Sequence, residues 1–170
     1  HDLHLRPHRT IRAVLFVNEE NGARGAKAYA EQHRDELAKT VMALESDTGG
    51  FAPQGFFVSG APDEPAGRGR GHADRAADAR AAPPPALARI AAIATLLAPI
   101  HATRVRAGHG GTDIEPMAAA GLPQVGLAVD MRHYFDYHHS EADTLDKVDP
   151  QELADDVAAV AVLADIVADM

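Results

Sequence analysis

Hydrophobic positions along the chain fall into short continuous runs and into sets at helical spacing. The first run, Ile11 to Asn18, is rich in branched side chains, which predicts a central strand covered on both faces. After Gly22, apolar residues recur at helical spacing from Ala23 to about Ala38, so a helix follows the turn. Two further buried strands are predicted, one over 41–47 and a short one between the glycines of 55–60.

The second half of the chain continues this alternation of strands and helices. The elements expected there are an amphipathic helix over 86–100 that stops near Pro99, an edge strand over 103–108, a short helix over 112–121 that ends at Gly121, and an apolar strand over 123–130. A last helix begins at Asp149 as N-cap, with Pro150 in its first turn. Its buried side is expected to include Val157, Val160, Val162, Ile166 and Val167.

Strands that alternate with helices predict an α/β fold, in which a largely parallel or mixed sheet lies between two helical layers. With 170 residues, the chain is long enough for one domain and too short for two ordinary ones. We therefore expect a single domain over 1–170. The segment 61–85 is rich in Gly, Arg, Asp, Ala and Pro, which predicts an exposed loop or insertion without chemistry of its own.

Composition narrows the chemistry that this domain can perform. The formal net charge of −9 argues against nucleic acid as a partner, because phosphate neutralisation needs clustered Lys and Arg. With no cysteine, the chain has no disulfide, thiolate metal site or Cys nucleophile, so any metal must be bound by His, Asp and Glu. Apolar runs do not reach transmembrane length, and the first ten residues lack the apolar core of a signal peptide, so no membrane partner is expected.

Polar residues cluster after four of the predicted strands. Glu19 and Glu20 follow the first strand, Glu45 and Asp47 close the second, and the segments 108–113 and 134–144 follow later strands. In α/β sheets, sites form beyond the carboxyl ends of strands, so we expect these groups on one rim of the sheet. Neighbouring carboxylates repel each other, and a divalent cation between them converts this repulsion into shared attraction. The clusters therefore predict a metal site.

Adjacent residues in an extended chain point in opposite directions, so two neighbouring carboxylates are expected to have different roles. One Glu of the pair would bind metal, and the other would stay free as a base for the attacking water. Likewise, only one of His138 and His139 is expected to reach the metal.

Several other interpretations of these residues remain open at the level of sequence. The Glu pair could complement a helix dipole, and Asp47 could cap a turn. Glu45, two residues earlier on the same strand face, rivals Asp47 as a ligand. A serine hydrolase would need a Gly-x-Ser-x-Gly elbow, which the chain does not contain. "GHGGTD" lacks the Lys-Ser/Thr pair of a nucleotide phosphate loop and the glycine spacing of a dinucleotide-binding motif.

The motifs "NEENGARG", "ESDTGG", "GHGGTD" and "YHHSEADT", in this order, resemble the zinc metallopeptidase family that includes carboxypeptidase Q and bacterial leucyl-type aminopeptidases. The resemblance runs from about Arg9 to the C-terminus and covers the second half of the family's catalytic domain. It implies a zinc-exopeptidase fold and, in the intact family domain, two zinc ions. Each motif alone is common, but the ordered set is specific.

The resemblance also implies roles for individual residues. Glu19 would be the general base, while Glu20 and His139 would bind one zinc and Asp47 the other. His138 would be a neighbour of the site. Outside the ligand set, three residues would belong to the substrate pocket or support the ligands: His109, Asp113 and Asp143.

The chain departs from the family pattern at its start. Family members place a His-x-Asp motif and a metal-bridging Asp upstream of the strand that carries the Glu pair, and only ten residues precede that strand here. "HDLHLRPH" does not fit the motif, so we assign no ligand to His1, Asp2 or His4. The resemblance thus implies a catalytic domain without its first half, and a sheet cut in this way would expose an edge that favours self-association.

These features favour a zinc-dependent exopeptidase (an aminopeptidase, carboxypeptidase or dipeptidase) that acts on small peptides, with Glu19 as general base. The alternative is a non-catalytic α/β binding or interaction domain that lacks the upstream ligands. The resemblance favours a secreted or periplasmic location.

Overall fold

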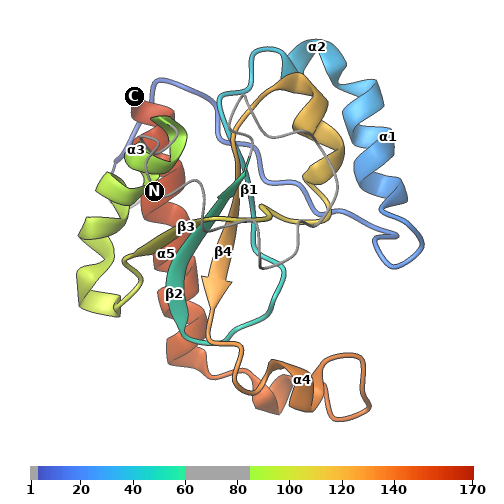
Figure 1. The fold of residues 1–170 in the computed structure, drawn as a ribbon, viewed down its shortest axis with the longest axis vertical. Coiled ribbons are helices and arrows are strands. Elements are labelled where there is room, and N and C mark those ends of the chain that lie inside the picture. Colours follow the sequence, from blue (N-terminus) through green and yellow to red (C-terminus); the bar gives the residue numbers. More distant parts are fainter. Residues whose placement is uncertain (1–3, 60–84) are drawn as a thin grey trace, which may run out of the picture.

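A four-stranded sheet lies at the centre of the structure, a computed structural model that describes residues 4–59 and 85–170 (Figure 1). The strands have the order β1-β4-β2-β3. Their bounds are Ala43–Glu45 for β1, Pro53–Ser59 for β2, Arg104–Ala107 for β3 and Gln124–Val129 for β4. The pairs β1–β4 and β2–β3 are parallel, whereas β2 and β4 are antiparallel, so the sheet is mixed.

Helices flank the sheet on two sides. The α-helices are α1 (Arg24–Gln32), α2 (Arg34–Leu37), α3 (Pro85–Ala94), α4 (Tyr134–Tyr137) and α5 (Pro150–Asp169), and the 3-10 helices are η2 (Thr95–Ile100), η3 (Glu115–Ala120) and η4 (Leu145–Lys147). In Figure 1, α3 and α5 lie to the left of the strands and α1 and α2 to the right, while α4 lies below them. The predicted α/β class, with a mixed sheet between helices, is confirmed.

Two hydrophobic clusters hold these layers together. The larger one joins α3, α5 and the sheet around three fully buried side chains, Phe56, Val125 and Leu163. The smaller one lies under α1 and α2 and contains Leu37, Ile114, Met117 and Leu122. Burial of a side chain of this size stabilises the folded state by about 1.5–3 kcal/mol, so the larger cluster supplies most of the apolar stabilisation.

The segment 11–18 is not a strand, so the prediction of a central strand there is wrong. Ile11, Leu15 and Val17 are 52%, 95% and 70% exposed. At its end, the carbonyl oxygens of Val17 and Asn18 accept hydrogen bonds from the start of α1. An apolar run indicates that a segment can pair in a sheet, but a strand forms only beside a partner, and none of the four described strands pairs with 11–18.

The helix ends follow the predicted signals. Asp149 Oδ1 accepts hydrogen bonds from the backbone N–H groups of Gln151 (2.7 Å) and Glu152 (3.0 Å), which confirms it as the N-cap of α5. Gly121 ends η3 in a left-handed conformation with φ 74°. The helix predicted over 23–38 divides at His33 into α1 and α2.

The buried face of α5 differs from the expected one at Val157, which is 61% exposed. Val160, Val162, Ile166 and Val167 pack against the larger cluster as predicted. The fully buried positions of the helix are Asp156, Ala159, Leu163 and Ala168. Each of these positions is the immediate neighbour of one that the prediction assigned to the buried face.

Two other predictions concern the chain as a whole. The loop expected over 61–85 lies outside the described residues except for Pro85, which begins α3. The single domain over 1–170 and self-association at a sheet edge stay predictions. Among residues 4–59 and 85–170, no helix combines the length and the apolar character that a membrane crossing needs.

Candidate functional site

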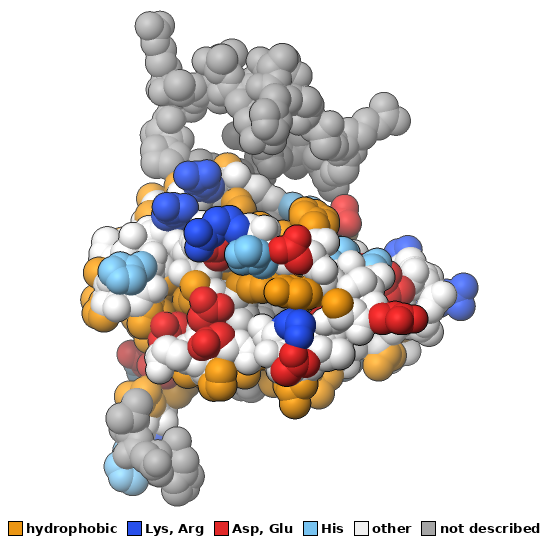
Figure 2. Space-filling model, turned by 90° about the horizontal axis from the view of Figure 1, so that it is seen from below, with side chains coloured by type: hydrophobic (Ala, Val, Ile, Leu, Met, Phe, Trp, Pro, Cys, Tyr) orange, Lys and Arg blue, Asp and Glu red, His pale blue; other side chains and the backbone are white. Residues whose placement is uncertain are grey.

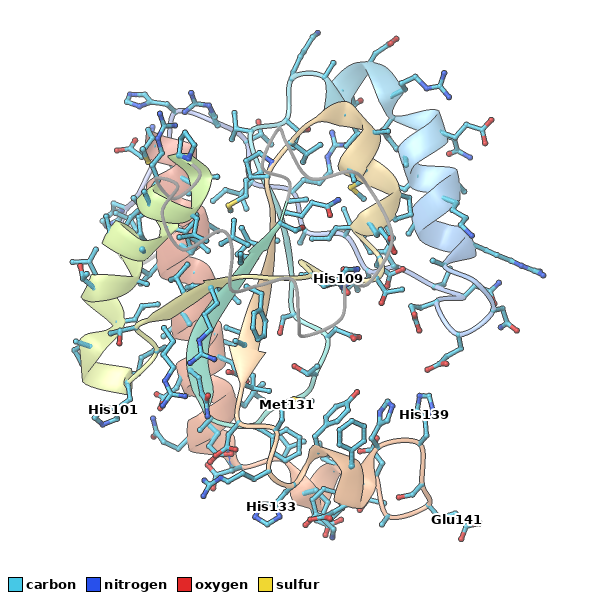
Figure 3. The ribbon with its side chains drawn as sticks, in the orientation of Figure 1. His101, His109, Met131, His133, His139 and Glu141 are labelled. Carbon is cyan, nitrogen blue, oxygen red and sulfur yellow. The ribbon has the colours of Figure 1, made fainter. Side chains whose placement is uncertain are left out.

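The site is built around a contact between Glu20 and His139, which are 119 residues apart in the sequence. His139 Nε2 donates a hydrogen bond of 2.8 Å to Glu20 Oε1. Glu20 lies in the turn that leads into α1, and His139 lies in the loop after α4. Both side chains are more than half exposed, so the contact is open to solvent. Figure 3 shows His139 at the top of the loop that follows α4, with its ring pointing upward from that loop.

Glu19 lies beside this pair and in the field of further carboxylates. Its pKa is raised, first by desolvation and then by the negative charges of Glu20, Asp47 and Asp113, while His139 acts in the opposite direction. Residues from all four predicted clusters therefore act on the Glu19 carboxyl group. A carboxylate with a raised pKa is a stronger base than an ordinary one.

Asp47 is near this group without touching the pair. It is exposed in the loop after β1, and its charge raises the pKa of Glu19, Glu45 and Asp113. Within the part of the chain that the structure describes, no three His, Asp or Glu side chains come together closely enough to hold a metal ion. The structure thus brings two of the three predicted ligands into contact and leaves the third nearby.

Glu45 has a structural role, which separates it from its rival Asp47. Its Oε2 accepts hydrogen bonds from the backbone N–H groups of Asp113 and Ile114, each 3.0 Å long. Desolvation is the main cause of its raised pKa, and the hydrogen bond from Ile114 opposes it. Because these hydrogen bonds hold the Glu45 carboxylate against the 108–114 loop, Asp47 remains as the candidate ligand from the 45–47 segment.

The 108–114 loop reaches the site by a route that the sequence did not predict. Because β3 runs antiparallel to β4, the carboxyl end of β3 lies at the opposite edge from those of β1 and β4, so the expectation of one common rim is wrong for this segment. The loop instead runs back along the sheet, where Gly110 packs closely on Gly126 and Gly111 on Glu45. This path carries Asp113 to the charged cluster.

Asp113 and His109, both predicted at the pocket, have different surroundings. The Oδ1 atom of Asp113 is buried and has no hydrogen-bond partner within the described ranges, and desolvation followed by the charge of Asp47 raises its pKa. His109 is exposed, with Nε2 at 3.7 Å from Glu115 Oε2. In Figure 3 it lies away from His139. The geometry therefore groups Asp113, but not His109, with the candidate ligands.

The 134–144 segment supplies the remaining predicted residues. The imidazole of His138 stacks on that of His139, with ring centroids 3.8 Å apart. The backbone N–H of Asp143 donates to the Ser140 carbonyl (3.1 Å), and its carboxylate contributes to the raised pKa of Tyr134, for which burial is the largest cause. Seen from below, this face carries acidic and histidine side chains next to hydrophobic ones (Figure 2).

Sequence reasoning missed Tyr134 and the structural role of Glu45. Tyr134 could have been found, because its spacing of four residues from His138 places the two rings on one face of a helical turn. The role of Glu45 had no local signal, since its partners lie 68 and 69 residues away in the sequence.

Gly111 gives a direct test of the Glu45 anchor. Its φ is +149°, and a Cβ atom there would overlap the Glu45 carboxylate. We expect Gly111→Ala to lower the free energy of unfolding by roughly 1–3 kcal/mol, because both backbone strain and steric overlap oppose the folded loop. Urea denaturation measures this change.

Gly121→Ala is the matched control for Gly111→Ala. Gly121 also has a positive φ (+74°), but a Cβ atom there would meet nothing within 4 Å. Gly121→Ala should lower the free energy of unfolding by about 1 kcal/mol, because backbone strain alone opposes the folded state. If both variants lose the same free energy of unfolding, the overlap with Glu45 does not contribute to the destabilisation.

Comparisons with known proteins give this geometry a context. The sequence pattern of peptidase family M28 matches residues 2–164. The chain belongs to this family. The fold agrees, because an M28 peptidase precursor from Shewanella amazonensis superposes with a TM-score of 0.79 at 33% sequence identity over 99% of this chain.

Among curated proteins, the chain is similar to carboxypeptidase Q from several vertebrates. It is 36% identical to the mouse protein and 34% identical to the human protein, in each case over 169 residues. These alignments cover 99% of this chain and 31% of each relative, and the Shewanella structure is covered to 34%. The chain thus spans about a third of the length of the M28 proteins that it matches.

Proposed function

We propose that this chain carries part of the catalytic centre of a zinc-dependent M28 exopeptidase. The observation that supports this most directly is the contact between Glu20 and His139, which joins a carboxylate and an imidazole from opposite ends of the sequence. Carboxylate oxygen and imidazole nitrogen are both ligands that zinc prefers. The buried oxygen of Asp113, which has no hydrogen-bond partner among the described residues, adds a polar group to the site.

Glu20 and His139 would hold one zinc and Asp47 the other, with further ligands from beyond the described residues, since a catalytic zinc usually has three protein ligands. When bound, zinc polarises a peptide carbonyl and makes water more acidic. Glu19 would accept a proton from the attacking water and later deliver it to the leaving amine. Its neighbours suit this role, because the carboxylates that raise its pKa also increase its affinity for the proton.

The substrate would be a small peptide, cleaved at one end. The curated relatives are named carboxypeptidases, which supports an exopeptidase over an endopeptidase. A secreted or periplasmic location, which the resemblance to the family favours, is part of this proposal.

A second candidate is a non-catalytic α/β binding or interaction domain. The absence of a group of three metal-binding side chains within residues 4–59 and 85–170 favours it. In this case, Glu20 and His139 would form an ordinary exposed ion pair, which contributes little to stability.

Zinc titration of the 170-residue chain separates the two candidates. We expect His139→Asn to weaken Zn²⁺ binding at least tenfold in calorimetry, because it removes an imidazole ligand. Asn is chosen because His139 has φ +55°, and Asn tolerates this left-handed backbone.

His101→Asn is the matched control, since His101 has a similar φ of +59° and lies at the end of η2. This variant should bind Zn²⁺ as the wild type does. Equal zinc affinity of wild type and His139→Asn, with no peptide hydrolysis by the wild type, would favour the non-catalytic candidate.

A further inference from the structure

His139 needs support to keep its imidazole facing Glu20. It lies in an exposed loop with a left-handed backbone (φ +55°), and its side chain is 61% exposed. One hydrogen bond at the surface does not fix a side chain of this kind, because water competes for the same groups. Contacts to the flat face of the ring therefore matter for its orientation.

Such contacts come from the two aromatic rings that precede it. The ring of His138 stacks on His139 at 3.8 Å with an interplanar angle of 25°, and Tyr134 stacks on the other side of His138 at 4.4 Å and 24°. Three rings thus lie nearly parallel in one column. Its order follows from α4, a single turn in which the backbone N–H of His138 donates to the Tyr134 carbonyl (2.9 Å).

The inner end of the column rests on the hydrophobic core. Tyr134 meets Phe51 edge to face, with ring centroids 6.4 Å apart at 69°. Phe51 in turn packs against the buried cluster between the sheet, α3 and α5. A continuous series of ring contacts therefore links the packed interior to the imidazole at the candidate metal site.

We propose that Tyr134 and His138 are positioning residues that hold the His139 imidazole toward Glu20 through this aromatic column. The proposal rests on the proposed function of His139 as a metal ligand. His138 acts through its ring face, so another planar ring can replace it. A ligand would act through a ring nitrogen, and no other ring could take its place.

NMR of the metal-free chain tests the column without any metal. The ring protons of His139 should be shifted upfield by the neighbouring ring in the wild type, and His138→Ala should abolish this shift. His138→Phe should retain it. His133→Ala, which removes an exposed imidazole just before α4, should leave it unchanged. Unchanged His139 shifts in His138→Ala would overturn the proposal.

Titration with Zn²⁺ alone tests the consequence for the site. We expect roughly tenfold weaker binding in His138→Ala and in Tyr134→Leu, as for other residues that orient a ligand, and near wild-type binding in His138→Phe and Tyr134→Phe. Equal losses in His138→Phe and His138→Ala would overturn the proposal, because His138 would then be a ligand itself. Failure of the proposed function gives a different result. In that case His139→Asn would bind zinc as the wild type does, while the His139 ring protons of the wild type would still be shifted upfield.

Discussion

In a peptidase-active form of this protein, Glu19→Gln is expected to lower kcat roughly 10²–10⁴-fold while the zinc content stays at the wild-type level. Gln has the same shape as Glu but cannot accept the proton from water. Zinc content should not change, because the contact with His139 comes from Glu20 and not from Glu19. Hydrolysis of a small chromogenic peptide and metal analysis of the same sample measure the two quantities.

The pH profile gives a second readout for Glu19. Desolvation and the neighbouring carboxylates raise its pKa, and a general base works only when deprotonated. Activity should therefore rise with pH through the Glu19 pKa, and the remaining activity of Glu19→Gln should lack this acid limb.

Glu31→Gln is the control, because Glu31 is an exposed acid on α1 within the same segment of the chain. It should have the activity and the pH profile of the wild type. Full activity in Glu19→Gln would remove Glu19 from the mechanism.

A second large effect is expected at Asp156, on the buried face of α5. This side chain is 4% exposed, and neither of its carboxylate oxygens has a hydrogen-bond partner within the described ranges. Burial, followed by the charges of Glu152 and Asp155, raises its pKa to about 7. The folded protein therefore keeps a proton on Asp156 that the unfolded chain releases near pH 4.

The sign of the effect on stability follows from this difference in protonation. Below pH 4 both states hold the proton, so Asp156 adds no electrostatic penalty. As the pH rises from 4 to 7, the unfolded state loses its proton first, and folding becomes less favourable. We expect Asp156→Asn to leave stability almost unchanged at pH 4 and to raise the free energy of unfolding by about 2–4 kcal/mol at pH 8.

Urea denaturation between pH 4 and pH 8 measures this effect. Asp165→Asn, on the same helix and less buried, is the control and should shift stability by less than about 0.5 kcal/mol at either pH. A parallel pH dependence for wild type and Asp156→Asn would mean that Asp156 does not titrate differently in the folded state.

Local signals in the sequence were sufficient for the ends of helices and for most strands. Asp149 could be assigned as an N-cap because its carboxylate bonds N–H groups only two and three residues away. The segment 11–18 was mistaken for a strand because hydrophobicity reports what a segment can bury, and not whether a neighbouring strand is present.

The candidate site was predictable in its residues and less so in its geometry. The ordered motifs identified Glu20 and His139, which meet in the structure. The antiparallel pairing of β2 with β4 was not encoded in any local pattern, and it changes the route by which Asp113 arrives. The anchoring of that route by Glu45 depends on backbone groups that are distant in sequence.

The 119-residue separation between Glu20 and His139 has a thermodynamic consequence. An ion bound by both side chains would cross-link the first and last quarters of the polypeptide. If it stayed bound in the denatured state, it would lower the conformational entropy of that state. The melting temperature would then depend on the free concentration of that ion, and a chelator would lower it even in a catalytically dead protein.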